Sequence, residues 1–76
     1  MTNKNYIKPG VDFIEFNVYR AAVKRAYENM VQEEMSKGIS YALATNVAYA
    51  YYRFDIEAVR NGEISDFSSI PGFRRY

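Results

Sequence analysis

The chain contains no cysteine and no histidine. The first absence excludes disulfides, and the two together exclude a zinc site of the ordinary kind, which binds the metal through thiolate and imidazole groups. Neither supplement is therefore available to this protein of 76 residues, although a chain so short buries a smaller fraction of its surface than a large one. We expect it to gain stability from self-association or from a partner.

The same absences remove the usual catalytic groups, because histidine is the commonest general base and cysteine is an effective nucleophile. Glu33 and Glu34 are adjacent, so around a helix they diverge and do not form a converging acid–base pair. The four glycines stand alone at positions 10, 38, 62 and 72, so there is no glycine-rich loop for phosphate. We expect no enzymatic activity, no cofactor and no metal site.

Charge of one sign is also not in excess. Ten basic and nine acidic residues give a net charge of +1, which provides no general attraction to nucleic acid or to an anionic membrane. No apolar run of about 18 residues is present for a membrane span, and the N-terminal stretch MTNKNYIKPG lacks the apolar core of a signal peptide. These features predict a cytoplasmic protein without a membrane partner.

Apolar and aromatic residues, by contrast, are plentiful. They make up 49% and 17% of the chain, and the aromatic share comes from eight tyrosines and five phenylalanines. A chain with this composition is expected to fold, and its length allows one domain over residues 1–76. Residues 1–11 form an N-terminal arm that Pro9 and Gly10 close with a type II turn.

A first helix is predicted over residues 12–37. Asp12 is placed as its N-cap, with Glu15 completing a capping box, and Gly38 supplies the left-handed residue after its end. Glu33 and Lys37 have the spacing of an i,i+4 ion pair. One apolar stripe follows the helical period. It consists of Phe16, Tyr19, Ala22, Val23, Ala26, Tyr27 and Met30.

A second helix is predicted over residues 41–61, with Ser40 as its N-cap and Gly62 at its end, antiparallel to the first. It has two apolar faces. One face holds Leu43, Val47, Ala50, Tyr51, Phe54 and Ala58, and the other Tyr41, Ala48, Tyr49, Tyr52, Ile56 and Val59. A single neighbouring helix covers a stripe of roughly 100°, so one face stays uncovered. We expect an all-α antiparallel two-helix hairpin that pairs into a dimeric four-helix arrangement, with Tyr51 and Phe54 in the core.

The C-terminal arm, residues 63–76, places an apolar side chain at every third position. These side chains are Ile64, Phe67, Ile70, Phe73 and Tyr76. Pro71 excludes a regular α-helix through the middle of the arm. Three interpretations remain: an ordered arm docked on its own domain or on a dimer mate, a docking peptide for another protein, or chance spacing in a disordered tail.

These features favour a small non-enzymatic interaction module, an adaptor or inhibitor that binds a larger protein through an aromatic and arginine-containing surface. Tyrosine suits such surfaces because it brings a large area at low entropic cost. The predicted interaction residues are Tyr49, Tyr52, Phe67, Ile70, Phe73, Arg74, Arg75 and Tyr76. A small accessory protein of viral or phage origin would fit this design, although no residue establishes that origin.

Two alternatives stay open. The first is an RNA- or DNA-binding module in which tyrosines stack on bases and cations contact phosphates. Its candidate contacts are Arg20, Lys24, Arg25, Arg53 and Arg60. The second is a structural component of a larger assembly, connected through the C-terminal arm.

Overall fold

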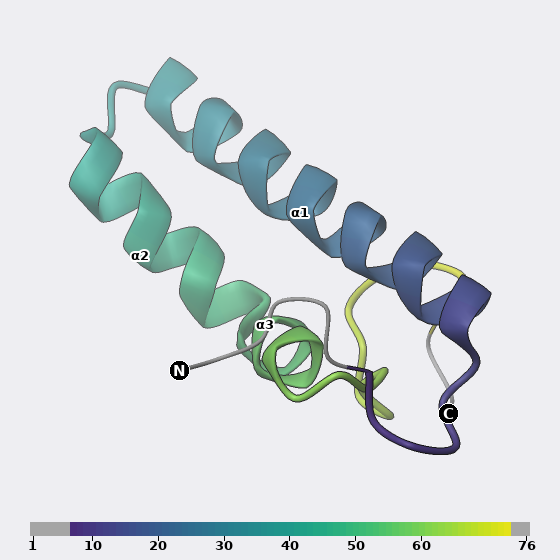
Figure 1. Ribbon diagram of the computed structural model, residues 1–76. Coiled ribbons are helices and arrows are strands. Elements are labelled where there is room, and N and C mark those ends of the chain that lie inside the picture. The colour runs from purple at the N-terminus through teal and green to yellow at the C-terminus, as the bar shows by residue number, and fades with distance from the viewer. Residues whose placement is uncertain (1–6, 74–76) are drawn as a thin grey trace.

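The computed structural model describes residues 7–73, which form an all-α fold of three helices without strands. Helix α1 spans Phe13–Ser36, α2 spans Tyr41–Tyr51 and α3 spans Arg53–Arg60. Figure 1 shows α2 returning alongside the C-terminal part of α1, which confirms the antiparallel hairpin. The pairing of two hairpins into a dimer stays a prediction.

The start of α1 follows its local sequence signals. The Asp12 side chain accepts a hydrogen bond from the Glu15 backbone N–H at 2.7 Å, as expected of an N-cap. Just before it, the Val11 N–H donates to the Lys8 carbonyl at 3.2 Å, and Gly10 has a φ of 91°. A positive φ at the third position identifies the predicted type II turn.

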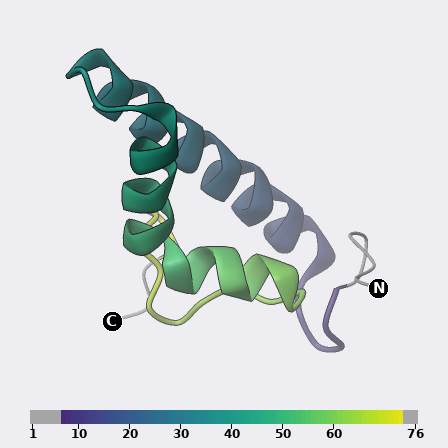
Figure 2. The same ribbon diagram turned by 90° about the vertical axis from the view of Figure 1, so that its left-hand side faces the viewer.

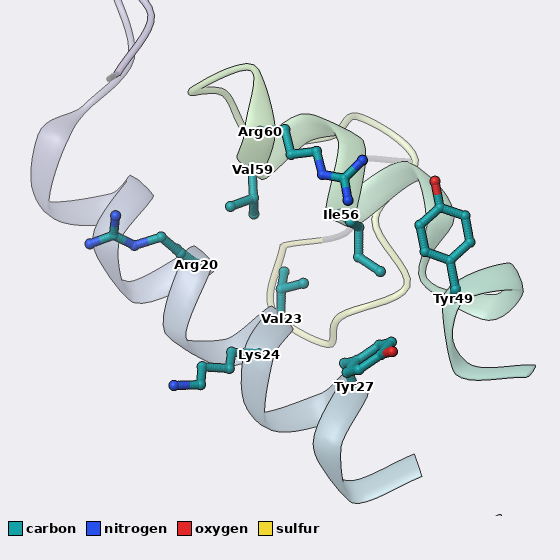
Figure 3. A pocket seen from close by; sticks show the side chains of 8 residues that line it. All are labelled: Arg20, Val23, Lys24, Tyr27, Tyr49, Ile56, Val59 and Arg60. Atoms are coloured by element: carbon teal, nitrogen blue, oxygen red, sulfur yellow. The ribbon is translucent and has the colours of Figure 1, made fainter. Parts of the chain in front are cut away.

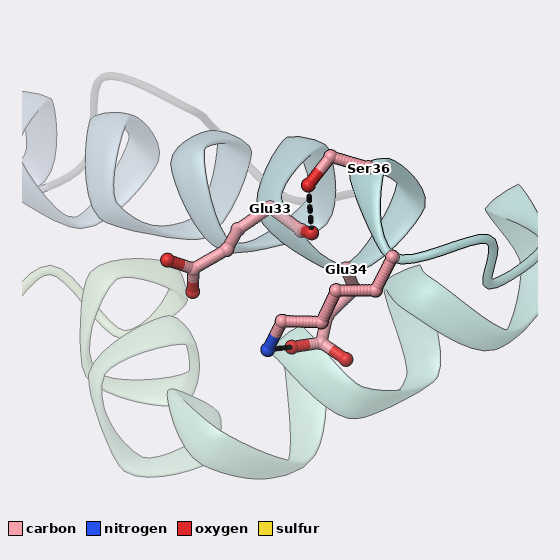
Figure 4. A network of polar contacts seen from close by, with 4 residues as sticks. Glu33, Glu34 and Ser36 are labelled. Atoms are coloured by element: carbon pink, nitrogen blue, oxygen red, sulfur yellow. Dashed lines mark hydrogen bonds and ion pairs between the residues drawn. The ribbon is translucent and has the colours of Figure 1, made fainter.

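The end of α1 is closed by side chains and by the loop that follows. The Ser36 hydroxyl donates to the Glu33 carbonyl at 2.6 Å, and Lys37 pairs with the Glu34 carboxylate at 3.3 Å (Figure 4). The expected pair of Lys37 with Glu33 is therefore wrong by one position. Beyond Gly38 the chain reverses, and the Ser40 hydroxyl accepts the Leu43 N–H at 3.3 Å to cap α2.

The single helix predicted over residues 41–61 is wrong, because the chain breaks at Tyr52. This residue has φ −103° and ψ 22° and ends α2 while it begins α3. Figure 2 shows α3 leaving the axis of α2 and running back towards the first turn of α1. Neither proline nor glycine stands at the break, so contacts elsewhere in the fold must stabilise it.

The core has two parts. Its larger cluster contains Phe16, Tyr19, Val23, Ala58 and Ile70, and its smaller one contains Val31, Ala44 and Ala48. The predicted stripe of α1 supplies Phe16, Tyr19 and Val23 as expected, whereas the buried Val31 lies outside it. Because α2 contributes only two alanines, α1 and α2 pack closely without covering the large side chains of α2.

The C-terminal arm folds back onto its own domain. Ile70 is buried, Ile64 and Phe73 pack against the larger cluster, and the Phe73 ring centroid lies 5.1 Å from that of Tyr19. The structure thus favours the interpretation of an ordered arm, while Tyr76 lies outside the described residues. The N-terminal arm is attached just after the C-terminal end of α3, where the Lys8 N–H donates to the Gly62 carbonyl at 2.7 Å.

None of the three helices in this part of the chain combines the length and the apolar character needed to cross a membrane. The molecule is thin as well as small, with principal extents of 43, 32 and 16 Å. Its accessible surface is 5535 Å², several hundred Å² more than the about 4800 Å² expected for a compact monomer of its mass. Large apolar side chains remain exposed on all three helices and on the arm.

Candidate interaction surfaces

A buried carboxylate connects α1, α3 and the C-terminal arm. Asp55 is the one charged side chain within residues 7–73 that is fully buried. One of its oxygens accepts the Tyr19 hydroxyl at 2.5 Å, and the other accepts the Ser69 backbone N–H at 2.9 Å. Asp55 lies in the first turn of α3, where the helix dipole favours a negative charge. These hydrogen bonds connect α3 to α1 and to the arm just beyond the break at Tyr52.

The serines of the arm complete this cluster. The Ser65 N–H donates to the Tyr19 hydroxyl at 3.4 Å, and the Ser68 hydroxyl accepts the Ile70 N–H at 3.0 Å. The Ser65 hydroxyl accepts the Phe67 N–H at 3.1 Å. These side chains therefore satisfy the backbone of a tight, irregular segment, and they hold Phe67 at the surface.

Sequence reasoning missed this role of Asp55. A signal was present, because an acidic residue interrupts the apolar face that Tyr52 and Val59 define at i−3 and i+4. A buried carboxylate requires hydrogen-bond partners, and the Tyr19 hydroxyl was available on the apolar stripe of α1.

Burial, and then the hydrogen bond to Asp55, raises the pKa of Tyr19 well above its ordinary value. The unfolded chain therefore loses this proton near pH 10 while the folded protein keeps it. The retained Tyr19 proton therefore contributes to the free energy of unfolding. This contribution is complete below pH 10, and it falls by about 1.4 kcal/mol per pH unit as the pH rises towards the folded pKa. Burial raises the pKa of Tyr52 as well, which acts in the same direction.

Urea denaturation between neutral pH and strongly alkaline pH measures this slope. We expect Tyr19→Phe to flatten it and Tyr41→Phe to leave it unchanged, because Tyr41 is an exposed tyrosine. Equal slopes in the wild type and in Tyr19→Phe would contradict the assignment.

A second feature is a set of large apolar side chains left in solvent, here named the outer stripe. It consists of Leu43, Val47, Tyr51, Phe54 and Phe67. The first three follow one line of α2 at i, i+4 and i+8, and the Phe54 ring lies 6.3 Å from that of Phe67. Tyr51 is 57% exposed and Phe54 is 59% exposed. Their predicted place in the core is therefore wrong, because α1 covers the alanine face of α2 instead.

The predicted interaction residues separate into different environments. Tyr49 and Phe67 are exposed, whereas Tyr52 packs against the core at the break. Ile70 is buried and Phe73 is half-buried in the docked arm, where both pack in or against the larger core cluster. The remaining three lie outside the described residues: Arg74, Arg75 and Tyr76.

The candidate nucleic-acid contacts also separate. Arg20, Lys24 and Arg60 line one groove between α1 and α3. Arg25 is exposed on α1 away from that groove, and Arg53 pairs with Glu57 at 3.4 Å. Arg60 thus shares this groove with two cations of α1, although the chain changes direction at Tyr52.

Within the part of the chain that the structure describes, no three metal-binding side chains converge on one point. Comparison with protein-family models finds no match, and searches of curated proteins and of solved structures find none either. The functional interpretation therefore depends on the surfaces themselves.

Proposed function

We propose that the protein is a non-enzymatic interaction module that binds a larger protein through the outer stripe. The observation that supports this function is the exposure of five large apolar side chains on α2, α3 and the arm. Such residues are costly to leave in water, and contiguous apolar patches of several hundred Å² on a monomer are often functional.

The aromatic part of the stripe is substantial. Tyr51, Phe54 and Phe67 are 57%, 59% and 66% exposed, which corresponds to about 350 Å² if a free aromatic side chain presents about 200 Å². Leu43 and Val47 extend this surface along α2. Burying it against a partner would supply the apolar centre that stable protein interfaces require.

The stripe is also held in place before a partner arrives. Phe67 is anchored by the Ser65 hydroxyl, and Phe54 precedes the buried Asp55 on α3. An aromatic side chain on a rigid backbone loses little conformational entropy on binding, which favours its use as an anchor. The exposed Arg53 lies beside these rings in sequence and provides a polar edge.

Exchanging Tyr51 and Phe54 for serine will test this function. We expect the double variant to lose partner capture in a pull-down from the cells that produce the protein, while its helical circular dichroism is retained. A matched control exchanges Phe13 and Ile14, which are 65% and 72% exposed on α1. Because these residues are as exposed as the stripe, the control separates the stripe from general surface apolarity.

Capture of the same partner by both double variants would contradict the proposal. Light scattering over a concentration series provides a second criterion. A dimer that only the Tyr51 and Phe54 exchange dissociates would assign the stripe to a second copy of the chain and not to a larger partner.

A further inference from the structure

The groove between α1 and α3 combines an apolar floor with a basic rim, and it is separate from the outer stripe. Its cavity volume is about 360 Å³. The lining residues are Arg20, Val23, Lys24, Tyr27, Tyr49, Ile56, Val59 and Arg60. The volume is more than twice the roughly 150 Å³ in which an engineered apolar cavity holds benzene, so one aliphatic or aromatic side chain fits with room to spare.

The residues that line the groove are apolar, aromatic or basic. Val23, Ile56 and Val59 form the floor, and none of the residues that line the groove is acidic. Figure 3 shows the Arg60 guanidinium directed towards Tyr49, while the charged ends of Arg20 and Lys24 point outward from the opposite side. The cations therefore stand at the rim of the groove.

We propose that this groove binds an acidic peptide segment of a partner protein. One aliphatic or aromatic side chain of the segment enters the floor, and carboxylates flanking it contact Lys24 and Arg60. Neither cation forms an ion pair within residues 7–73, so a partner carboxylate does not need to displace an internal one. Complementarity of charge around an apolar anchor is the arrangement that gives specificity at protein interfaces.

A nucleic acid fits the groove less well. Along α1 the positive charge spans a single helical turn from Arg20 to Lys24, and Glu28 follows one turn later on the same side. The Arg20 guanidinium already donates to the Asn17 side chain at 2.8 Å and lies 5.8 Å from the Phe16 ring centroid. A strand of nucleic acid needs a longer basic track than this groove provides, although Tyr27 and Tyr49 are among its lining residues.

Fluorescence anisotropy with the full chain tests the proposal. The probe is a short labelled peptide with a central phenylalanine between aspartates and glutamates. Two matched peptides replace the acids by their amides or the phenylalanine by alanine. We expect either change to weaken binding about tenfold or more, as loss of one close charge pair or one apolar anchor does. NMR shifts should localise the acidic peptide to Val23, Ile56 and Val59.

Variants then separate the groove from general charge. Lys24→Gln and Arg60→Gln should each weaken binding of the acidic peptide about tenfold. Arg25→Gln and Arg53→Gln remove the same charge from exposed positions outside the groove and should change it little. None of these four side chains is buried, so all four variants should fold.

Three results would overturn the proposal. The first is equal binding of the acidic and amide peptides, or no binding of either. The second is tighter binding of a labelled oligothymidylate, which would assign the groove to nucleic acid. The third is loss of peptide binding as the protein self-associates, which would assign it to the Asp66 and Phe67 segment of another copy. Because the outer stripe is not involved, these results do not depend on the function proposed above.

Discussion

Replacing Asp55 by alanine will cost the folded protein about 3 kcal/mol, because two charge-assisted hydrogen bonds are lost together. The variant leaves the Tyr19 hydroxyl and the Ser69 N–H without their carboxylate partner in a buried site. A chain of this length has a total stability of about 4 to 11 kcal/mol, so the loss is a large fraction of it. Urea denaturation followed by circular dichroism measures the change.

Asp66→Ala is the matched control, because Asp66 is an exposed acid in the arm. We expect it to change the stability by less than about 0.5 kcal/mol. Asp55→Asn keeps the shape and one acceptor oxygen, so its loss should be intermediate. If Asp55→Ala proved no more destabilising than Asp66→Ala, the buried cluster would not be what holds α3 and the arm together.

The helix ends could be predicted from the sequence because they depend on neighbouring residues. Asp12 and Ser40 cap helices through N–H groups three positions ahead, within their own segments. Gly38 adopts a φ of 93°, which few other residues tolerate. Each signal is local, so each can be interpreted without knowledge of the tertiary structure.

The break at Tyr52 could not be predicted in the same way. Residues 41–61 contain no proline and no glycine, and their local preference favours one continuous helix. The bend is consistent with contacts made far along the chain, in which Asp55 meets Tyr19 and Ser69. A periodic pattern identifies the faces of a helix but not the segment that will cover each face.

The candidate surfaces show the same division. An uncovered apolar face on the second helical segment followed from its having two such faces. The identity of the exposed side chains could not be predicted, because α1 packs on Ala44 and Ala48 and leaves Tyr51 in solvent. The groove was not predicted, because its lining comes from all three helices and depends on how they pack together.

Replacing Phe16 by alanine should be among the most damaging exchanges on α1. Phe16 is 1% exposed in the larger core cluster, and its removal leaves a cavity that α3 and the arm share. Deleting a buried phenylalanine costs about 3 to 5 kcal/mol, of the order of this chain's whole stability. We expect the variant to be largely unfolded at 37 °C, with loss of the circular dichroism signal of α1, α2 and α3 together.

The control lies three residues earlier on the same helix. Phe13 is 65% exposed, so Phe13→Ala removes the same atoms from water instead of from the core and should cost less than about 0.5 kcal/mol. If Phe16→Ala lost little stability, the cluster around Tyr19 and Ile70 would be packed too loosely for a cavity there to destabilise the fold. The thin, incompletely covered fold described above predicts the opposite, because each of its few buried side chains carries a large share of the stability.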